Sequence, residues 1–331
     1  MNRILSRSRF RNMLPGKTFL ALLAIAFGAA FLQTPLAAAQ GAPARPALTQ
    51  ISSDPFTIGP GQHATEVEPH MLANGATLVA AFQTGRIVDG GGTAIGWATS
   101  TDGGTSWSHG FLPGLTTGNG GGLYDAASDP AVAFDAKHGV WMIATLPISN
   151  TKETPAVVVS RSTDGGFTWE NPVSVGANVA SSDKNWIACD SNSASPFYGN
   201  CYVEWDNPAT GDGILMSTSS DGGLTWGAAT GTTNRAAGIG GQPLVQPSGT
   251  VVVPIETSGM SSFTSTDGGK TWSKPVTISS IQSHIDAGGI RSGPLPAGAP
   301  WTTDAEFDAI TSHFQAPTED EGFNVIRHER A

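Results

Sequence analysis

Ser100-Thr-Asp-Gly-Gly-Thr-Ser-Trp107 is the stretch that decides the fold, because it occurs four times in the chain. The other copies are Ser162-Thr-Asp-Gly-Gly-Phe-Thr-Trp169, Ser219-Ser-Asp-Gly-Gly-Leu-Thr-Trp226 and Ser265-Thr-Asp-Gly-Gly-Lys-Thr-Trp272. We call this motif the Asp-Gly-Gly box. Its aspartates, Asp102, Asp164, Asp221 and Asp267, are separated by 62, 57 and 46 residues. A motif that returns at such intervals indicates a protein built from repeated structural units.

Each box has the composition of a hairpin turn. The aspartate carboxylate can accept backbone N–H groups across the turn, and two consecutive glycines permit positive φ. The box tryptophans are expected to enter the apolar layer beneath the turn; they are Trp107, Trp169, Trp226 and Trp272. We therefore predict a structural role for the box aspartates and tryptophans.

The segments around the boxes alternate like β-strands. A strand is expected directly before each box, at Thr93–Thr99, Ala156–Ser160, Gly213–Thr218 and Ser261–Thr264. Two further strands joined by a turn are expected upstream of it in every unit, as around Asn74-Gly75, and a short strand closes the unit. Three strands, a box and a fourth strand per unit predict an all-β fold of four-stranded propeller blades.

Composition agrees with this fold class. Only 13% of the 331 residues are charged, about half the ~25% usual in soluble domains, while 39% are hydrophobic and 42 are glycine. This much apolar material excludes disorder throughout the chain, and the scarcity of charge excludes helical bundles and coiled coils.

The N-terminus reads as a targeting segment. Five basic residues precede Gln40, the apolar run Thr18–Leu32 is short for a membrane span, and Ala37-Ala38-Ala39 suits a signal peptidase. We predict a signal peptide over residues 1–39, a linker over 40–63, a propeller over 64–296 and an irregular tail over 297–331. The expected location is secreted, extracellular or periplasmic, with no membrane insertion after cleavage.

The net charge of the chain after cleavage limits the classes of molecule that it is expected to bind. Cleavage would leave 12 basic residues against 27 acidic ones, a net charge of −15. So acidic a protein is not expected to bind the phosphate backbone of a nucleic acid.

The chain has only two cysteines, Cys189 and Cys201. In an oxidising compartment such a close pair predicts a disulfide. Zinc would need more ligands nearby, and a catalytic thiol would need a basic partner that this acidic stretch does not supply. No metal and no cofactor are expected.

The boxes resemble the Asp-boxes of bacterial neuraminidase repeats, which occur in β-propellers of the sialidase superfamily. The stretch from Pro69 to Arg86 is similar to the opening blade of sialidases, and Gly240-Gly-Gln-Pro…Thr250-Val-Val-Val-Pro254 is similar to a later blade. The resemblance covers residues 64–280. Sialidase propellers have six blades, and about four are complete in this sequence. The resemblance therefore predicts an incomplete six-bladed propeller. Two explanations are open: the chain is a truncated product of a longer gene, or it assembles with another copy.

The resemblance also implies where chemistry would lie. Sialidases clamp the substrate carboxylate with three arginines, use a tyrosine assisted by a glutamate as nucleophile, and use an aspartate as acid/base. Arg86 falls where the family has its second first-blade arginine, and Asp89 lies close to the acid/base position. Val67 replaces the first clamp arginine, and no counterpart of the nucleophile is found. A loop salt bridge between Arg86 and Asp89 is the competing interpretation.

Four other positions invite two interpretations each. Glu204 and Asp206 are either paired carboxylates for glycoside cleavage or a solvated strand end, and Glu256 is open to the same choice. Tyr124 is either a sugar-stacking aromatic or a loop anchor.

Three functions are compatible with these features. The first is a secreted, sialidase-like propeller that recognises a glycan with an incomplete catalytic set. The alternatives are an active exo-sialidase-type glycoside hydrolase and a non-catalytic extracellular scaffold.

Overall fold

The computed structural model describes residues 48–57, 61–87, 90–149, 154–176 and 181–279. The chain divides into two compact units, Met1–Thr49 and Gln50–Ala331. Only Leu48 and Thr49 of the first unit are described, so the fold below is that of the second. The predicted signal peptide and the predicted tail lie outside the described residues. No helix among the described residues is long and apolar enough to cross a membrane.

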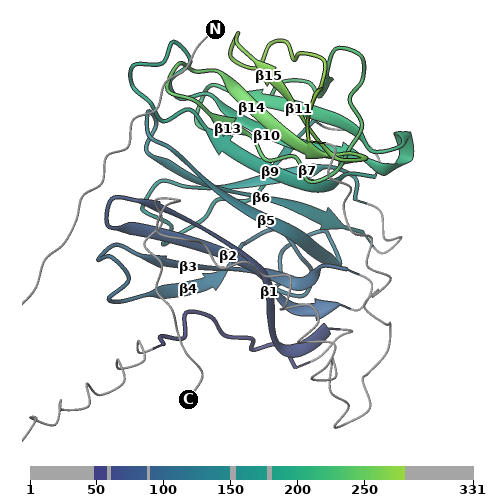
Figure 1. The fold of residues 1–331 in the computed structure, drawn as a ribbon. Coiled ribbons are helices and arrows are strands. Elements are labelled where there is room, and N and C mark those ends of the chain that lie inside the picture. Colours follow the sequence, from purple (N-terminus) through teal and green to yellow (C-terminus); the bar gives the residue numbers. More distant parts are fainter. Residues whose placement is uncertain (1–47, 58–60, 88–89, 150–153, 177–180, 280–331) are drawn as a thin grey trace, which may run out of the picture. The chain divides into compact units, whose positions relative to one another are not determined.

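The described residues form an all-β fold of four antiparallel, four-stranded units, which we call blades (Figure 1). Blade 1 contains β1 (Gly61–Asn74), β2 (Thr77–Ile87), β3 (Gly92–Ser100) and β4 (Ser108–Phe111). Blade 2 contains β5 (Ala126–Asp135), β6 (Val140–Ile148), β7 (Val157–Ser162) and β8 (Val173–Val175). Blade 3 contains β9 (Asp183–Cys189), β10 (Cys201–Asn207), a 3-10 turn (Pro208–Thr210), β11 (Gly213–Ser219) and β12 (Thr230–Gly231). Blade 4 contains β13 (Leu244–Val245), β14 (Val251–Glu256), β15 (Met260–Ser265) and β16 (Val276–Ser279).

This architecture confirms the predicted fold class. Within each blade the strands pair in chain order, and a single pair, Gly92 with Ala127, links blades 1 and 2 into one sheet. The first strand of each blade lies against the first strand of the next, since β1 contacts β5, β5 contacts β9 and β9 contacts β13. We call these the inner strands. Their side-by-side packing lines an axis, as in a propeller; the incomplete six-bladed ring stays a prediction.

The apolar core fills the space between successive blades. One cluster joins blades 1 and 2 around Trp97 and Trp141, a second joins blades 2 and 3 around Trp205, and a third joins blades 3 and 4 around Phe263. Strands such as β7 and β10 are buried along their whole length because a blade covers each face.

Every box lies between the third and fourth strands of its blade. In blade 3, the Asp221 carboxylate accepts hydrogen bonds from the Ser219 hydroxyl at 2.8 Å, the Thr225 N–H at 3.0 Å and the Thr225 hydroxyl at 2.5 Å. Gly222 and Gly223 have φ of 72° and 78°, which explains the glycine pair. Trp107 and Trp226 are half-buried, whereas Trp169 and Trp272 are buried in core clusters.

The boxes also connect blades. The carbonyl of the first box glycine accepts a hydrogen bond from the preceding blade in three cases: Thr99 to Gly165 at 2.6 Å, Arg161 to Gly222 at 2.6 Å, and Asn200 to Gly268 at 3.2 Å. Arg161 also pairs with Glu170 at 2.6 Å, so it is a structural residue between blades.

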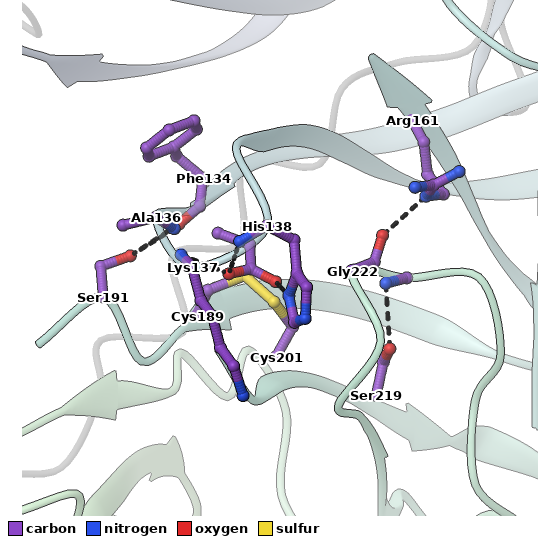
Figure 2. Close-up of a disulfide and its surroundings, with 12 residues drawn as sticks. Phe134, Ala136, Lys137, His138, Arg161, Cys189, Ser191, Cys201, Ser219 and Gly222 are labelled. Atoms are coloured by element: carbon purple, nitrogen blue, oxygen red, sulfur yellow. Dashed lines mark hydrogen bonds and ion pairs between the residues drawn. A yellow bond between two sulfur atoms is a disulfide. The ribbon is translucent and has the colours of Figure 1, made fainter. Parts of the chain in front are cut away.

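The predicted disulfide is present. Cys189 and Cys201 lie directly opposite each other on β9 and β10, with their Cα atoms 4.0 Å apart. Figure 2 shows the disulfide beside the β5–β6 turn, where the Ser191 hydroxyl donates to the Phe134 carbonyl at 2.8 Å. The same view shows Arg161 pointing to the Gly222 carbonyl. The disulfide thus lies beside the contact between blades 2 and 3.

Candidate functional site

A cavity of about 240 Å³ with several polar lining residues lies between the inner strands β1, β5 and β9. Glu68 of β1, Asp129 of β5, and Lys184 and Asn185 of β9 line it, together with Gly241 at the approach to β13. We call this cavity the axial mouth. Residues from all four blades therefore meet at one place, although they are far apart in sequence.

The same backbone feature places three of these side chains. Glu68, Asp129 and Lys184 have φ of 52°, 47° and 47°, a left-handed conformation that residues other than glycine rarely adopt. Each lies at a register shift between its inner strand and the neighbouring strand. Such β-bulges re-aim side chains and are frequent beside functional sites. The repeated bulge indicates a position shaped for function.

Hydrogen bonds connect the carboxylates of blades 1 and 2. The buried Gln83 amide nitrogen donates to a Glu68 oxygen at 2.6 Å and to the Ser128 hydroxyl at 3.1 Å. Ser128 in turn donates to Asp129 at 2.5 Å, and Lys184 Nζ lies 3.5 Å from the other Asp129 oxygen. The axial mouth therefore carries two carboxyl groups and one ammonium group held in fixed positions.

The charged groups at the axial mouth shift one another's pKa values. Burial raises the pKa of Glu68 above its usual value, and the neighbouring Asp129 carboxylate raises it further, while Lys184 and Arg86 act in the opposite direction. Asp129 is the main cause of the raised pKa of Lys184, with Asp183 and Glu68 contributing against the effect of burial. Lys184 is thus firmly cationic.

Asn185 lines the axial mouth and has a side-chain amide without hydrogen-bond partners among the described residues. It is 3% exposed, and neither its Nδ2 nor its Oδ1 atom has a hydrogen-bond partner within the described residues. A buried amide without partners costs about 1–3 kcal/mol. Its donor and acceptor are therefore available to a group that enters the cavity.

Two aromatic rings form the floor of the mouth. His70 of blade 1 and Trp186 of blade 3 lie with ring centroids 4.5 Å apart, and both line the cavity. The Val132 N–H of blade 2 donates to His70 Nδ1 at 2.8 Å. Burial lowers the pKa of His70, which favours the neutral imidazole that this bond requires. Below these rings lies a second, mostly apolar cavity of about 320 Å³ between the inner strands.

Glu204 and Asp206 lie behind the mouth, and the expectation of a solvated strand end is wrong for both. Each is 0% exposed on β10, and none of their carboxyl oxygens has a hydrogen-bond partner within the described residues. A Cβ added at Gly241 would come within 2.6 Å of the Glu204 carboxyl, so the backbone of Gly241 covers that group. Of the two interpretations offered by the sequence, the solvated strand end is therefore excluded for Glu204 and Asp206.

Burial governs the protonation of both groups. It raises the pKa of Glu204 well above the usual value, and Asp206 adds to the effect. Burial, followed by the Asp183 and Asp212 carboxylates, raises the pKa of Asp206 to about 7. Burial therefore favours the protonated form of Glu204, and Asp206 is partly protonated near neutral pH.

The other residues proposed from sequence lie away from the cavity lining. Arg86 ends β2 and donates from Nη1 to the Gly91 carbonyl at 3.0 Å, close enough to Glu68 to affect its pKa. Tyr124 packs against the core cluster between blades 1 and 2. Glu256 pairs with Ile239 through its backbone. Asp89 lies outside the described residues, so its proposed role, like that of Arg86, stays a prediction.

Sequence reasoning missed Glu68, Asp129, Lys184 and Asn185. A signal was present, because Glu68, Asp129 and Lys184 precede the box aspartates of their blades by 34, 35 and 37 residues. Aligning the blades on their boxes would have placed these three positions within three residues of one another. Their φ values and the missing partners of Asn185 are visible only in the structure.

Comparison with known proteins supports the sialidase resemblance. The chain matches no protein-family model. A curated sialidase of Bacteroides fragilis (strain YCH46) is 31% identical over 110 residues, which are 28% of this chain and 20% of that protein. The chain therefore spans about a fifth of the curated relative it matches.

Solved structures with a related arrangement include three sialidases. Hadza microbial sialidase Hz136 has a TM-score of 0.49 and 18% identity, covering 63% of this chain and 46% of that one. The leech intramolecular trans-sialidase has a TM-score of 0.49 and 14% identity, covering 71% and 54%. The intramolecular trans-sialidase of Ruminococcus gnavus has a TM-score of 0.49 and 14% identity, covering 70% and 73%.

The fold and the site define an all-β, bladed protein with a cavity between its inner strands. The chain is similar in sequence to a sialidase over the matched stretch, which confirms the resemblance predicted from its sequence.

Proposed function

We propose that this chain is a secreted, sialidase-like propeller that recognises a glycan at the axial mouth. The observation that carries the proposal is Asn185, an amide that is buried, lines the cavity and has no partner within the described residues. One donor and one acceptor on a single planar group match two neighbouring hydroxyl groups of a sugar ring. The Cys189–Cys201 disulfide supports a location in an oxidising compartment.

The rest of the mouth suits the same ligand. The Glu68 and Asp129 carboxyl groups can accept hydrogen bonds from hydroxyls, and Lys184 can donate one. His70 and Trp186 supply an apolar surface against which the C–H face of a sugar can pack. A volume of about 240 Å³ is below the ~300–1,000 Å³ of sites for larger ligands, which favours a single ring.

Hydrolysis is the second candidate, and one observation favours it. Burial and the Asp129 carboxylate raise the pKa of Glu68, and a carboxyl group with a raised pKa close to a second carboxyl group is an arrangement used in glycoside cleavage. The catalytic set of sialidases is nevertheless incomplete in this sequence, so recognition without turnover is our first choice. A scaffold without a sugar ligand is the third possibility.

Glycan binding and turnover are measured on the same mature protein. A glycan array and fluorogenic glycosides are tested with the wild type, with Asn185→Ala, and with Asn171→Ala as a matched control at an exposed asparagine outside the cavity. We expect Asn185→Ala to weaken binding at least tenfold, with Asn171→Ala unchanged. Release of fluorophore by the wild type would establish the hydrolase. Absence of any bound glycan would refute the proposal and leave the scaffold.

A further inference from the structure

The charge of the axial mouth is negative. Glu68, Asp129 and Lys184 are the charged residues that line the cavity, and together they carry one net negative charge when ionised. Two further charged groups are close enough to act on them: Asp183, which raises the pKa of Lys184, and Arg86, which lowers that of Glu68. Asp183 adds a negative charge and Arg86 a positive one. When the lining groups are ionised, an entering group therefore meets two carboxylates against one ammonium group at the cavity wall.

Lys184 is already neutralised by the protein. Its ammonium lies 3.5 Å from Asp129, and the carboxylates of Asp129, Asp183 and Glu68 all raise its pKa. Arg86 donates to the Gly91 carbonyl and does not line the cavity. A carboxylate ligand would thus find no free cation among the described residues that line the mouth.

Building on the proposed glycan function, we infer that the axial mouth takes uncharged sugars and rejects sugars that carry a carboxylate. Hydroxyl groups can donate to Glu68 and Asp129, whereas a ligand carboxylate can only accept and would stand beside two like charges. Both protein carboxylates would also lose contact with water as the ligand enters, which strengthens the repulsion.

This specificity differs from that implied by the sialidase resemblance. An arginine clamp binds an acidic sugar, and the sequence reasoning gave Arg86 that role. The lining of the cavity has two acids where such a clamp needs cations. The similarity of fold and the choice of ligand are therefore separate properties of this chain.

The test uses sugars of the same size, of which one is neutral and the other carries a carboxylate. Binding of the mature protein is measured for glucose, galactose and mannose against their uronic acids. We expect whichever neutral sugar binds to do so at least tenfold more tightly than its acidic counterpart, and the ratio to fall as salt is added. Equal or tighter binding of the acidic sugar would overturn the inference and leave the proposed glycan function intact. Binding of neither sugar would overturn the proposed function itself.

Two variants report on the cause. Glu68→Gln with Asp129→Asn leaves Lys184 as an unpaired cation, and we expect this double variant to lose the discrimination or to prefer the uronic acid. Lys184→Gln should increase the discrimination, and it serves as the readout where the double variant fails to fold. Asp125→Asn, at an exposed aspartate outside the cavity lining, is the control and should keep the wild-type ratio. An unchanged ratio in both Lys184→Gln and the folded double variant would refute the charge mechanism.

Discussion

Replacing Asp206 by asparagine should remove a large part of the pH dependence of folding. The carboxyl group of Asp206 is buried and has no hydrogen-bond partner in the part of the chain that the structure describes. Burial and the neighbouring Asp183 and Asp212 carboxylates raise its pKa from 3.8 to about 7. A carboxyl whose pKa is higher in the folded state takes up a proton on folding. Its contribution to stability is therefore complete below pH 3.8 and is lost as the pH rises through about 7.

The magnitude follows from the shift. One pKa unit corresponds to about 1.4 kcal/mol, so the full shift of about three units costs about 4 kcal/mol at high pH. Roughly 3 kcal/mol of this cost develops between about pH 5 and pH 8, because the unfolded carboxyl is already ionised at the lower value. The asparagine variant has no proton to lose, so its free energy of unfolding should fall by about 3 kcal/mol less over the same interval.

Urea unfolding at pH 5 and pH 8 measures the difference between wild type and Asp206→Asn. Asp125→Asn removes an exposed carboxylate and should follow the wild type at both values. The same pH dependence in Asp206→Asn and wild type would refute the reasoning, because it would show that Asp206 is ionised in the folded protein at no cost.

Two further predictions concern the architecture. Asp221→Ala should lower the free energy of unfolding by about 1–3 kcal/mol, because the Thr225 N–H and two hydroxyl groups lose their acceptor. The glycan affinity should stay unchanged. Thermal unfolding and a binding assay measure the two quantities, and a variant that is stable but does not bind would show that the box is functional. Replacing both Cys189 and Cys201 by serine should lower the free energy of unfolding, measured with urea, by about 2–3 kcal/mol, because the disulfide closes a short loop. Labelling of both thiols in the native wild-type protein would contradict the disulfide.

The fold could be predicted from the sequence because the boxes are local. A Ser-x-Asp-Gly-Gly turn is specified by side chains within eight residues, and its four copies mark where the third strand of each blade ends. The disulfide could also be predicted from the sequence, because two cysteines allow only one pairing. These features depend on short-range chemistry that the sequence displays directly.

The candidate site depends on long-range packing, and the sequence did not reveal it. Glu204 lies in the middle of β10, and only the folded chain shows that the backbone of Gly241, before β13, covers its carboxyl group. Glu68 and Asp129 are 61 residues apart and are linked through Gln83 and Ser128, which carry no motif. The family resemblance directed attention to Arg86, one strand away from the cavity lining.

The three bulges explain how a fold built from repeated blades can bind a ligand in one orientation. Blades 1 to 3 each hold a residue other than glycine at positive φ at a register shift of the inner strand, which costs on the order of 1–3 kcal/mol. The sequence then fills these positions differently, with Glu68, Asp129 and Lys184. Identical residues would present the same chemistry from every blade, whereas two acids and a lysine distinguish the blades around the axis. Together with the single amide of Asn185, this asymmetry gives a sugar ring one preferred orientation in the mouth.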